Sequence, residues 1–276
     1  MKSQLMTLAR HYRYLAELNA NMLLPTRTAL ELGARCKRTY QDIHFSVPSL
    51  HLRELFPRVP TDPKNAVKLM PGTALDGGPN IIEQFTLCAL VKMIQPNTIL
   101  EIGTFRGGTT WHFYDNAPPD TLIYTLDLPD GEVPGDVTDQ QLAANKARPF
   151  LPRSERVRQI LINSKKWNGV LDRKAQFVFI DADHSYEGVR NDTEKAMISL
   201  DTCACICWHD SLEDDFGYGT MRYLNELVTN GWKLFRLRGS HEISSITIFM
   251  TGEMRKKFNI PEPHMGAYLF RDYVGR

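Results

Sequence analysis

The sequence has few of the features that assign a chain at once to a membrane, secreted or nucleic-acid-binding class. No apolar run approaches the roughly 18 residues that a membrane-spanning helix needs, so no membrane partner is expected. A net charge of +1 leaves no electrostatic excess for binding nucleic acid. The 5 cysteines are an odd number without a CxxC pair, which argues against a secreted disulfide framework and indicates a cytoplasmic location.

Three of the cysteines form the stretch CACIC at residues 203–207. Alternate residues of a strand share one face, so Cys203, Cys205 and Cys207 are expected to line up on the same side. We expect them to be small packing residues of a central strand rather than metal ligands.

The sequence also lacks the Gly-x-Gly-x-x-Gly pattern of dinucleotide-binding folds. In its place stands LEIGTFRGGTTWHF, residues 100–113, with glycines at 103, 107 and 108. Phe105 occupies the position of the middle glycine, where the backbone would otherwise approach a pyrophosphate. The apolar strand, tight turn and following helix therefore favour a nucleotide-type ligand that has no diphosphate.

Helix and strand patterns alternate regularly from residue 80 onward. Residues 1–35 are expected to form an amphipathic helix, and residues 40–80 are rich in proline and turn residues. The expected strands are 98–103, 121–128, 156–164, 175–183, 203–211, 232–239 and 244–252. The expected helices are 80–94, 107–117, 138–151, 186–200 and 219–231. Only a tight turn joins the last two strands, so they are expected to be antiparallel.

This order predicts an α/β fold. We expect a doubly wound, mostly parallel seven-stranded sheet that ends in an antiparallel hairpin. The main domain is expected at residues 80–251, after an N-terminal extension at 1–79 and before a C-terminal tail at 252–276. Ligands of such sheets bind at the carboxyl ends of the strands, where the strand order switches.

Polar side chains stand where two of the strands end. Asp127 ends the strand that follows the glycine turn, where a carboxylate can accept both hydroxyls of a ribose. Its alternative role is to cap the turn in DLPDG. Asn163 and Ser164 end the next strand, where they either meet the edge of an adenine or simply begin a loop.

An acidic cluster follows the two most apolar strands. Asp181 and His184 come after FVFI, and His209 and Asp210 come after CACICW. Two carboxylates at neighbouring strand ends repel each other unless a cation or a proton lies between them. A hard divalent cation such as Mg²⁺ fits there, and the alternative is a pair of carboxylates that touch the cofactor or a helix N-terminus without a metal.

With these residues the chain resembles the class I S-adenosylmethionine-dependent methyltransferases. The resemblance rests on LEIGTFRGG, Asp127, FVFIDADHSYEGVRND, CWHDS and the last hairpin, and it covers roughly residues 80–250. It implies a Rossmann-like fold and S-adenosylmethionine as the cofactor. It implies that Glu101 and Gly103 shape the methionine end of the pocket, that Thr104 and Gly107 of the same turn bind the cofactor, and that Asp127 binds the ribose.

Within this family the segment FIDADHSYEGVRND is similar to metal-dependent small-molecule and sugar O-methyltransferases and to cephalosporin-hydroxylase-like proteins. That likeness implies that Asp181 and Asp210 hold a divalent metal, that Asp181 also touches the cofactor, and that His184 is the general base. His209 stands where the macrolide-sugar enzymes have a glutamate. His209 is therefore a candidate third ligand for a softer ion, or else it caps a loop.

The expected function is S-adenosylmethionine-dependent O-methylation of a small-molecule hydroxyl, on a sugar or natural product. One alternative is an NAD(P)-dependent oxidoreductase, against which the missing glycine pattern and the terminal hairpin count. The other is a non-methylating protein on the same fold. The N-terminal amphipathic helix leaves open whether the chain forms a homodimer.

Overall fold

The structure is a computed structural model of the chain. It describes residues 47–55, 57, 66–70, 78–129, 132, 148–211, 218–238 and 243–262, all of which belong to one compact unit, Val47–Gly266. The expected helix at 1–35 and most of the expected helix at 138–151 lie outside the described residues. None of the helices in these ranges is long and apolar enough to cross a membrane.

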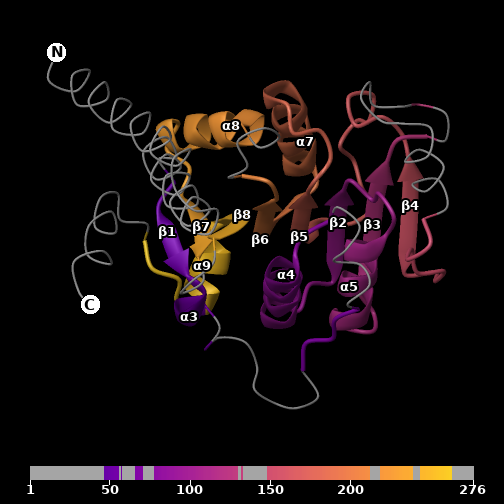
Figure 1. Cartoon of the computed structure of the whole chain (residues 1–276), viewed down its shortest axis with the longest axis horizontal. Helices are drawn as coiled ribbons and strands as arrows, with labels where there is room; N and C mark the ends of the chain where they lie inside the picture. Colours follow the sequence, from indigo (N-terminus) through magenta and orange to yellow (C-terminus); the bar gives the residue numbers. More distant parts are fainter. Residues whose placement is uncertain are drawn as a thin grey trace, which may run out of the picture. The chain divides into compact units, whose positions relative to one another are not determined.

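A single mixed sheet organises the described residues (Figure 1). Its strand order is β1-β7-β8-β6-β5-β2-β3-β4. The strands are β1 (Ser49–His51), β2 (Thr98–Ile102), β3 (Leu122–Asp127), β4 (Val157–Leu161), β5 (Ala175–Ile180), β6 (Leu200–Trp208), β7 (Leu234–Arg238) and β8 (Ile243–Met250). Among these, β8 alone runs antiparallel to its neighbours β6 and β7.

The observed topology confirms the predicted fold class and its C-terminal hairpin. One correction concerns the number of strands, because the sheet formed by the described residues has eight strands rather than seven. The additional strand, β1, pairs in parallel with the distant β7, from Ser49 opposite Arg236 to His51 opposite Arg238. Three residues at a sheet edge leave no alternation long enough to be recognised in the sequence.

The strand order switches between β2 and β5. The chain moves outward from β2 through β3 to β4, and then returns to place β5 on the other side of β2. The carboxyl ends of β2 and β5 therefore meet at the point where ligands of such sheets bind. Every residue of the predicted site lies at the carboxyl end of β2, β3, β4, β5 or β6 or in the turn that follows it.

Helices cover both faces of this sheet (Figure 1). Helices α3 (Leu52–Leu55), α4 (Ile81–Ile94), α5 (Gly108–Asn116) and α9 (Gly252–Phe258) contribute to one apolar cluster. Helices α7 (Tyr186–Ile198) and α8 (Tyr218–Thr229) pack against each other on the opposite face. The predicted helices over 80–94, 107–117, 186–200 and 219–231 are thus confirmed to within a few residues.

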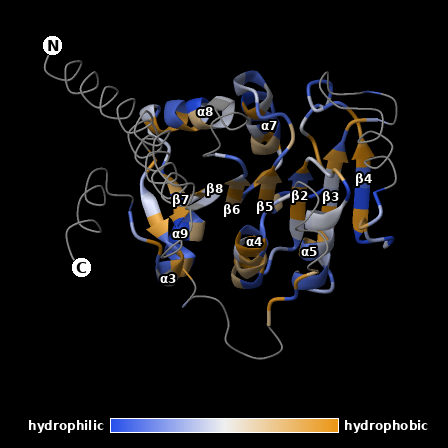
Figure 2. Cartoon of the chain, in the orientation of Figure 1, coloured by the Kyte–Doolittle hydropathy of each residue, from blue (hydrophilic) through white to orange (hydrophobic). Residues whose placement is uncertain are grey.

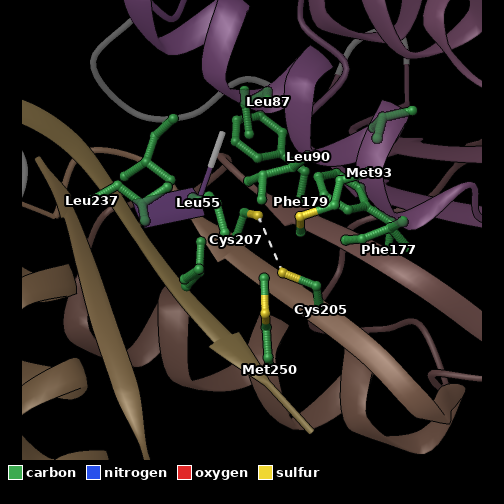
Figure 3. Packing of buried hydrophobic residues seen from close by; sticks show 14 of the residues in the cluster. Leu55, Leu87, Leu90, Met93, Phe177, Phe179, Cys205, Cys207, Leu237 and Met250 are labelled. Carbon is green, nitrogen blue, oxygen red and sulfur yellow. Dashed lines mark hydrogen bonds between the residues drawn. The ribbon is translucent and has the colours of Figure 1, made fainter. Parts of the chain in front are cut away.

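The apolar cluster explains the CACIC stretch. Cys205 and Cys207 are fully buried on the face of β6 that packs against Met250, with Phe177 and Phe179 of β5 in the same cluster (Figure 3). All four cysteines among the described residues are free. Figure 2 shows the same segregation, with apolar residues concentrated along the strands and on α4. The predicted packing role of these cysteines is confirmed.

Candidate active site

The glycine turn after β2 has the strained backbone that the sequence predicts. Gly103 and Gly107 have φ values of +107° and +84°. A Cβ on Gly103 would stand 2.2 Å from the carbonyl oxygen of Asp181, and one on Gly107 would stand 2.5 Å from the backbone nitrogen of Leu151. The glycines therefore admit the protein's own backbone as close neighbours, in addition to permitting the positive φ.

Glu101 is fully buried at the end of β2. The hydroxyls of Thr110 and Thr125 both donate to its Oε2, the latter at 2.6 Å, and Thr104 hydrogen-bonds Thr125 at 2.6 Å. No donor within the described residues reaches Oε1. Burial raises the pKa of Glu101 to about 8, even though the two threonine hydroxyls lower it.

Asp127 ends β3 beside an arginine that the sequence analysis did not identify. Nη2 and Nε of Arg148 each lie 3.3 Å from Oδ2 of Asp127, and the backbone N–H of Leu128 donates to Oδ1 at 2.9 Å. Burial raises the pKa of Asp127 despite the opposing effect of Leu128 and Arg148. The contact of Asp127 with a ribose stays a prediction.

Asn163 and Ser164 lie in the turn that follows β4. The side chain of Asn163 accepts from the backbone N–H of Lys165 at 3.0 Å. The hydroxyl of Ser164 accepts from the amide of Asn191 in α7 at 3.4 Å. Both side chains thus support local structure, and their contact with an adenine stays a prediction.

Asp181, His184 and Asp210 converge at the carboxyl ends of β5 and β6. Nε2 of His184 lies 3.4 Å from Oδ1 of Asp181 and 3.1 Å from Oδ2 of Asp210. One ligand atom from each of the three side chains lies within 4.8 Å of the other two, which is a spacing that a metal ion could bridge. Ser185 begins α7 directly after His184, with its hydroxyl accepting from Gly188 N–H at 3.1 Å, and this cap fixes the turn.

His209 lies deeper than this group and uses both ring nitrogens within the protein. Its Nδ1 lies 3.0 Å from Oδ1 of Asp181 and 3.2 Å from Oδ1 of Asp210. Its Nε2 lies 3.1 Å from Oε2 of Glu83. Burial lowers the pKa of His209, but Asp181, Asp210 and Glu83 raise it well above its ordinary value. With both nitrogens protonated and donating, His209 has no lone pair for a metal, which argues against the predicted role as third ligand.

The two histidines in turn keep Asp181 ionised. Burial would raise the pKa of Asp181, but the charge and hydrogen bonds of His209 and His184 outweigh it and hold the pKa at about 2. His184 is itself shifted, since Asp181 and Asp210 raise its pKa against the lowering effect of burial. Asp181 is therefore charged across the physiological pH range.

Two features of the site were not recognised in the sequence. Glu83, in the first turn of α4, and His209 are 126 residues apart in the chain. Ser211, directly after Asp210, is buried and donates to the carbonyl of Ser245 at 2.6 Å, while Thr247 donates to its hydroxyl at 2.9 Å. Ser211 is thus occupied in joining β6 to β8.

Comparison with known proteins finds one family that is similar to part of this chain. A family described as a methyltransferase domain matches residues 100–211, from β2 to the residue after Asp210. Comparison with proteins of curated function gives no match.

Several solved structures are similar to the chain. A Staphylococcus aureus protein with a provisional caffeoyl-CoA O-methyltransferase assignment aligns with a TM-score of 0.51 and 17% identity, over 73% of this chain and 97% of that one. A Podospora anserina methyltransferase bound to SAH aligns with a TM-score of 0.49 and 14% identity, over 83% of this chain and 98% of that one. The O-methyltransferase TomG of Streptomyces achromogenes, in complex with SAM, aligns with a TM-score of 0.46 and 19% identity, over 63% of this chain and 82% of that one. At these low identities, the alignment with the Staphylococcus aureus protein, whose TM-score is above 0.5, supports the fold and nothing beyond it.

Proposed function

We propose that the chain is a class I S-adenosylmethionine-dependent methyltransferase, and that it methylates a hydroxyl oxygen of a small molecule with the help of a divalent cation. The observation that carries the proposal is the convergence of Asp181, His184 and Asp210 beside the glycine turn. The proposed acceptor class, a sugar or natural product hydroxyl, rests on the resemblance of FIDADHSYEGVRND to metal-dependent small-molecule and sugar O-methyltransferases.

The residues around β2 and β3 fit S-adenosylmethionine. Oε1 of Glu101 is a buried acceptor that no described donor satisfies, and the ammonium group of the cofactor's methionine end is a suitable donor. Asp127 supplies a carboxylate for the two ribose hydroxyls, and Arg148 counters the effect of burial on its charge. An anionic pocket of this kind also suits a ligand that carries a sulfonium and no phosphate.

The residues around β5 and β6 fit a divalent cation. Two carboxylate oxygens and one imidazole nitrogen form a donor set that suits Mn²⁺ as well as Mg²⁺. Asp181 and Asp210 follow neighbouring strands, and a cation between their carboxylates relieves their mutual repulsion. A cation bound there supplies Lewis-acid chemistry, which lowers the pKa of an acceptor hydroxyl.

His184 admits a second role. A partly exposed imidazole beside the acceptor can take the hydroxyl proton, and this is the general-base role expected from the sequence. Its Nε2 faces both carboxylates, which favours the ligand role instead. A single nitrogen cannot ligate a metal and accept a proton at the same time, so the two roles make opposite predictions for metal affinity.

The test combines two titrations with a transfer assay. S-adenosylmethionine is titrated calorimetrically into the protein, and Mn²⁺ binding is followed by electron paramagnetic resonance. Labelled methyl transfer to a panel of hydroxylated acceptors is then measured with and without a chelator. Micromolar cofactor binding with chelator-sensitive transfer is the expected result. Cofactor binding with undiminished methyl transfer in the presence of the chelator would contradict the role of the cation. Binding of NAD(P) in place of S-adenosylmethionine would contradict the whole proposal.

Two variants test the cation site and distinguish the ligand role of His184 from its general-base role. Asp210→Asn is expected to weaken Mn²⁺ binding and methyl transfer together. His184→Asn weakens both if the imidazole is a ligand. It lowers transfer and leaves Mn²⁺ affinity unchanged if the imidazole is the base.

A further inference from the structure

Glu83 is the most completely engaged carboxylate in the described part of the site. Its Oε1 accepts from the backbone N–H and the hydroxyl of Ser245, both at 2.7 Å. Its Oε2 accepts from the backbone N–H of Asn80 at 3.0 Å and lies 3.1 Å from Nε2 of His209. Only 3% of the residue is exposed to solvent. Four donors from three parts of the chain therefore fix this carboxylate in one orientation.

Through His209, Glu83 also orients the cation cluster, which consists of Asp181, His184 and Asp210. Because Glu83 holds Nε2, the opposite ring nitrogen, Nδ1, faces Asp181 and Asp210 at 3.0 and 3.2 Å. The ring thereby fixes one oxygen of each carboxylate, and Oδ2 of Asp210 is left facing His184. Side chains that orient metal ligands in this way restrict the geometry that the ligands can offer.

We infer that Glu83 is a positioning residue: through His209 it holds Asp181 and Asp210 in the arrangement that binds the cation. The inference rests on the proposed function, because it concerns the same cation site. Among the described residues the carboxylate of Glu83 hydrogen-bonds Asn80, His209 and Ser245, none of which lies in the glycine turn, so its contribution is specific to the cation half of the site.

A purely structural role for Glu83 is the competing explanation. Glu83 also completes the capping box of α4, in which the side chain of Asn80 accepts from the backbone N–H of Glu83 at 3.1 Å. Loss of the cap alone destabilises a helix without moving His209. Asn80→Ala removes the side-chain cap on the same turn and touches no member of the cation cluster, which makes it the matched control.

The experiment measures Mn²⁺ affinity by electron paramagnetic resonance for the wild type, Glu83→Ala, Glu83→Gln and Asn80→Ala. Glu83→Ala is expected to weaken Mn²⁺ binding by up to about 100-fold, and Glu83→Gln by about 10-fold, because the amide keeps the shape but not all four acceptor bonds. Asn80→Ala is expected to lower the melting temperature and to leave Mn²⁺ affinity within about twofold. S-adenosylmethionine affinity, measured calorimetrically, is expected to stay within about twofold in all three variants, since outer partners of metal ligands act locally.

Equal Mn²⁺ affinity in the wild type and Glu83→Gln would overturn the inference, and so would an equal loss in Asn80→Ala. If Glu83→Ala does not fold, Glu83→Gln carries the comparison. Absence of Mn²⁺ binding by the wild type would overturn both the cation site and the inference, whereas S-adenosylmethionine binding would still report separately on the methyltransferase cofactor.

Discussion

Replacing Glu101 by glutamine tests the most strongly perturbed carboxyl group of the cofactor half. Burial raises the pKa of Glu101 from 4.5 to about 8. Because the pKa is higher in the folded state, folding is most favoured below pH 4.5, where the group is protonated in both states. This stability is lost progressively as the pH rises from 4.5 through about 8.

The magnitude follows from the size of the shift. Each pKa unit corresponds to about 1.4 kcal/mol, so the free energy of unfolding should fall by on the order of 4 kcal/mol between pH 4.5 and pH 9. Glutamine resembles the protonated form and keeps an acceptor for Thr110 and Thr125, so Glu101→Gln should lack this pH dependence. The two proteins should have similar stability at low pH, and the variant should be more stable at pH 9.

Urea unfolding at pH 5, 7 and 9 measures the effect, with Asp172→Asn as the control for loss of one exposed carboxylate. Parallel pH profiles for the wild type and Glu101→Gln would refute the reasoning. Adding S-adenosylmethionine extends the test, since a bound ammonium group favours the ionised carboxylate. Binding at pH 7 should then release close to one proton, about 0.9 by the shift in pKa, as measured by calorimetry in buffers of different ionisation enthalpy.

Two further predictions concern the ribose carboxylate and the turn that carries His184. Arg148→Ala should weaken S-adenosylmethionine binding by about 10-fold, and more at lower pH, because Asp127 loses a charged donor and takes up a proton more readily; unchanged affinity would mean that the ion pair is irrelevant to the ribose. Gly219→Ala would bring a Cβ to 2.3 Å from the carbonyl oxygen of His184, so methyl transfer should fall more than about 10-fold with stability lower by about 1–3 kcal/mol. Gly252→Ala, which meets nothing within 4 Å, is the matched control and should leave both quantities nearly unchanged.

The parts of the site that the sequence predicted are those that follow from local or topological rules. The glycine turn is a continuous stretch, and the positive φ values of Gly103 and Gly107 favour the glycines that stand there. Asp181 and Asp210 end neighbouring parallel strands, and such ends always meet at one edge of a sheet. The first conclusion needs only the residues of one short stretch, and the second needs only the order of the strands.

The parts that could not be predicted depend on contacts between distant segments. Glu83 has the sequence signature of a capping box, which accounts for the residue locally and hides its contact with His209. His209 looked like a ligand because histidine beside aspartate is typical of metal sites. Its side chain instead lies between three carboxylates, and that arrangement exists only once α4 has packed against the ends of β6 and β8.

The two halves of the site meet at the backbone of Asp181. Asp181 donates its backbone N–H to Ile102 at 2.9 Å, and its carbonyl oxygen lies where a Cβ of residue 103 would stand, while its side chain belongs to the cation cluster. Gly103→Ala forces the two segments apart and also strains a φ of +107°. It should therefore weaken S-adenosylmethionine and Mn²⁺ binding together, whereas Glu101→Gln should weaken only the former and Glu83→Gln only the latter. Loss of one ligand alone in Gly103→Ala would show that the cofactor turn and the cation cluster are mechanically independent.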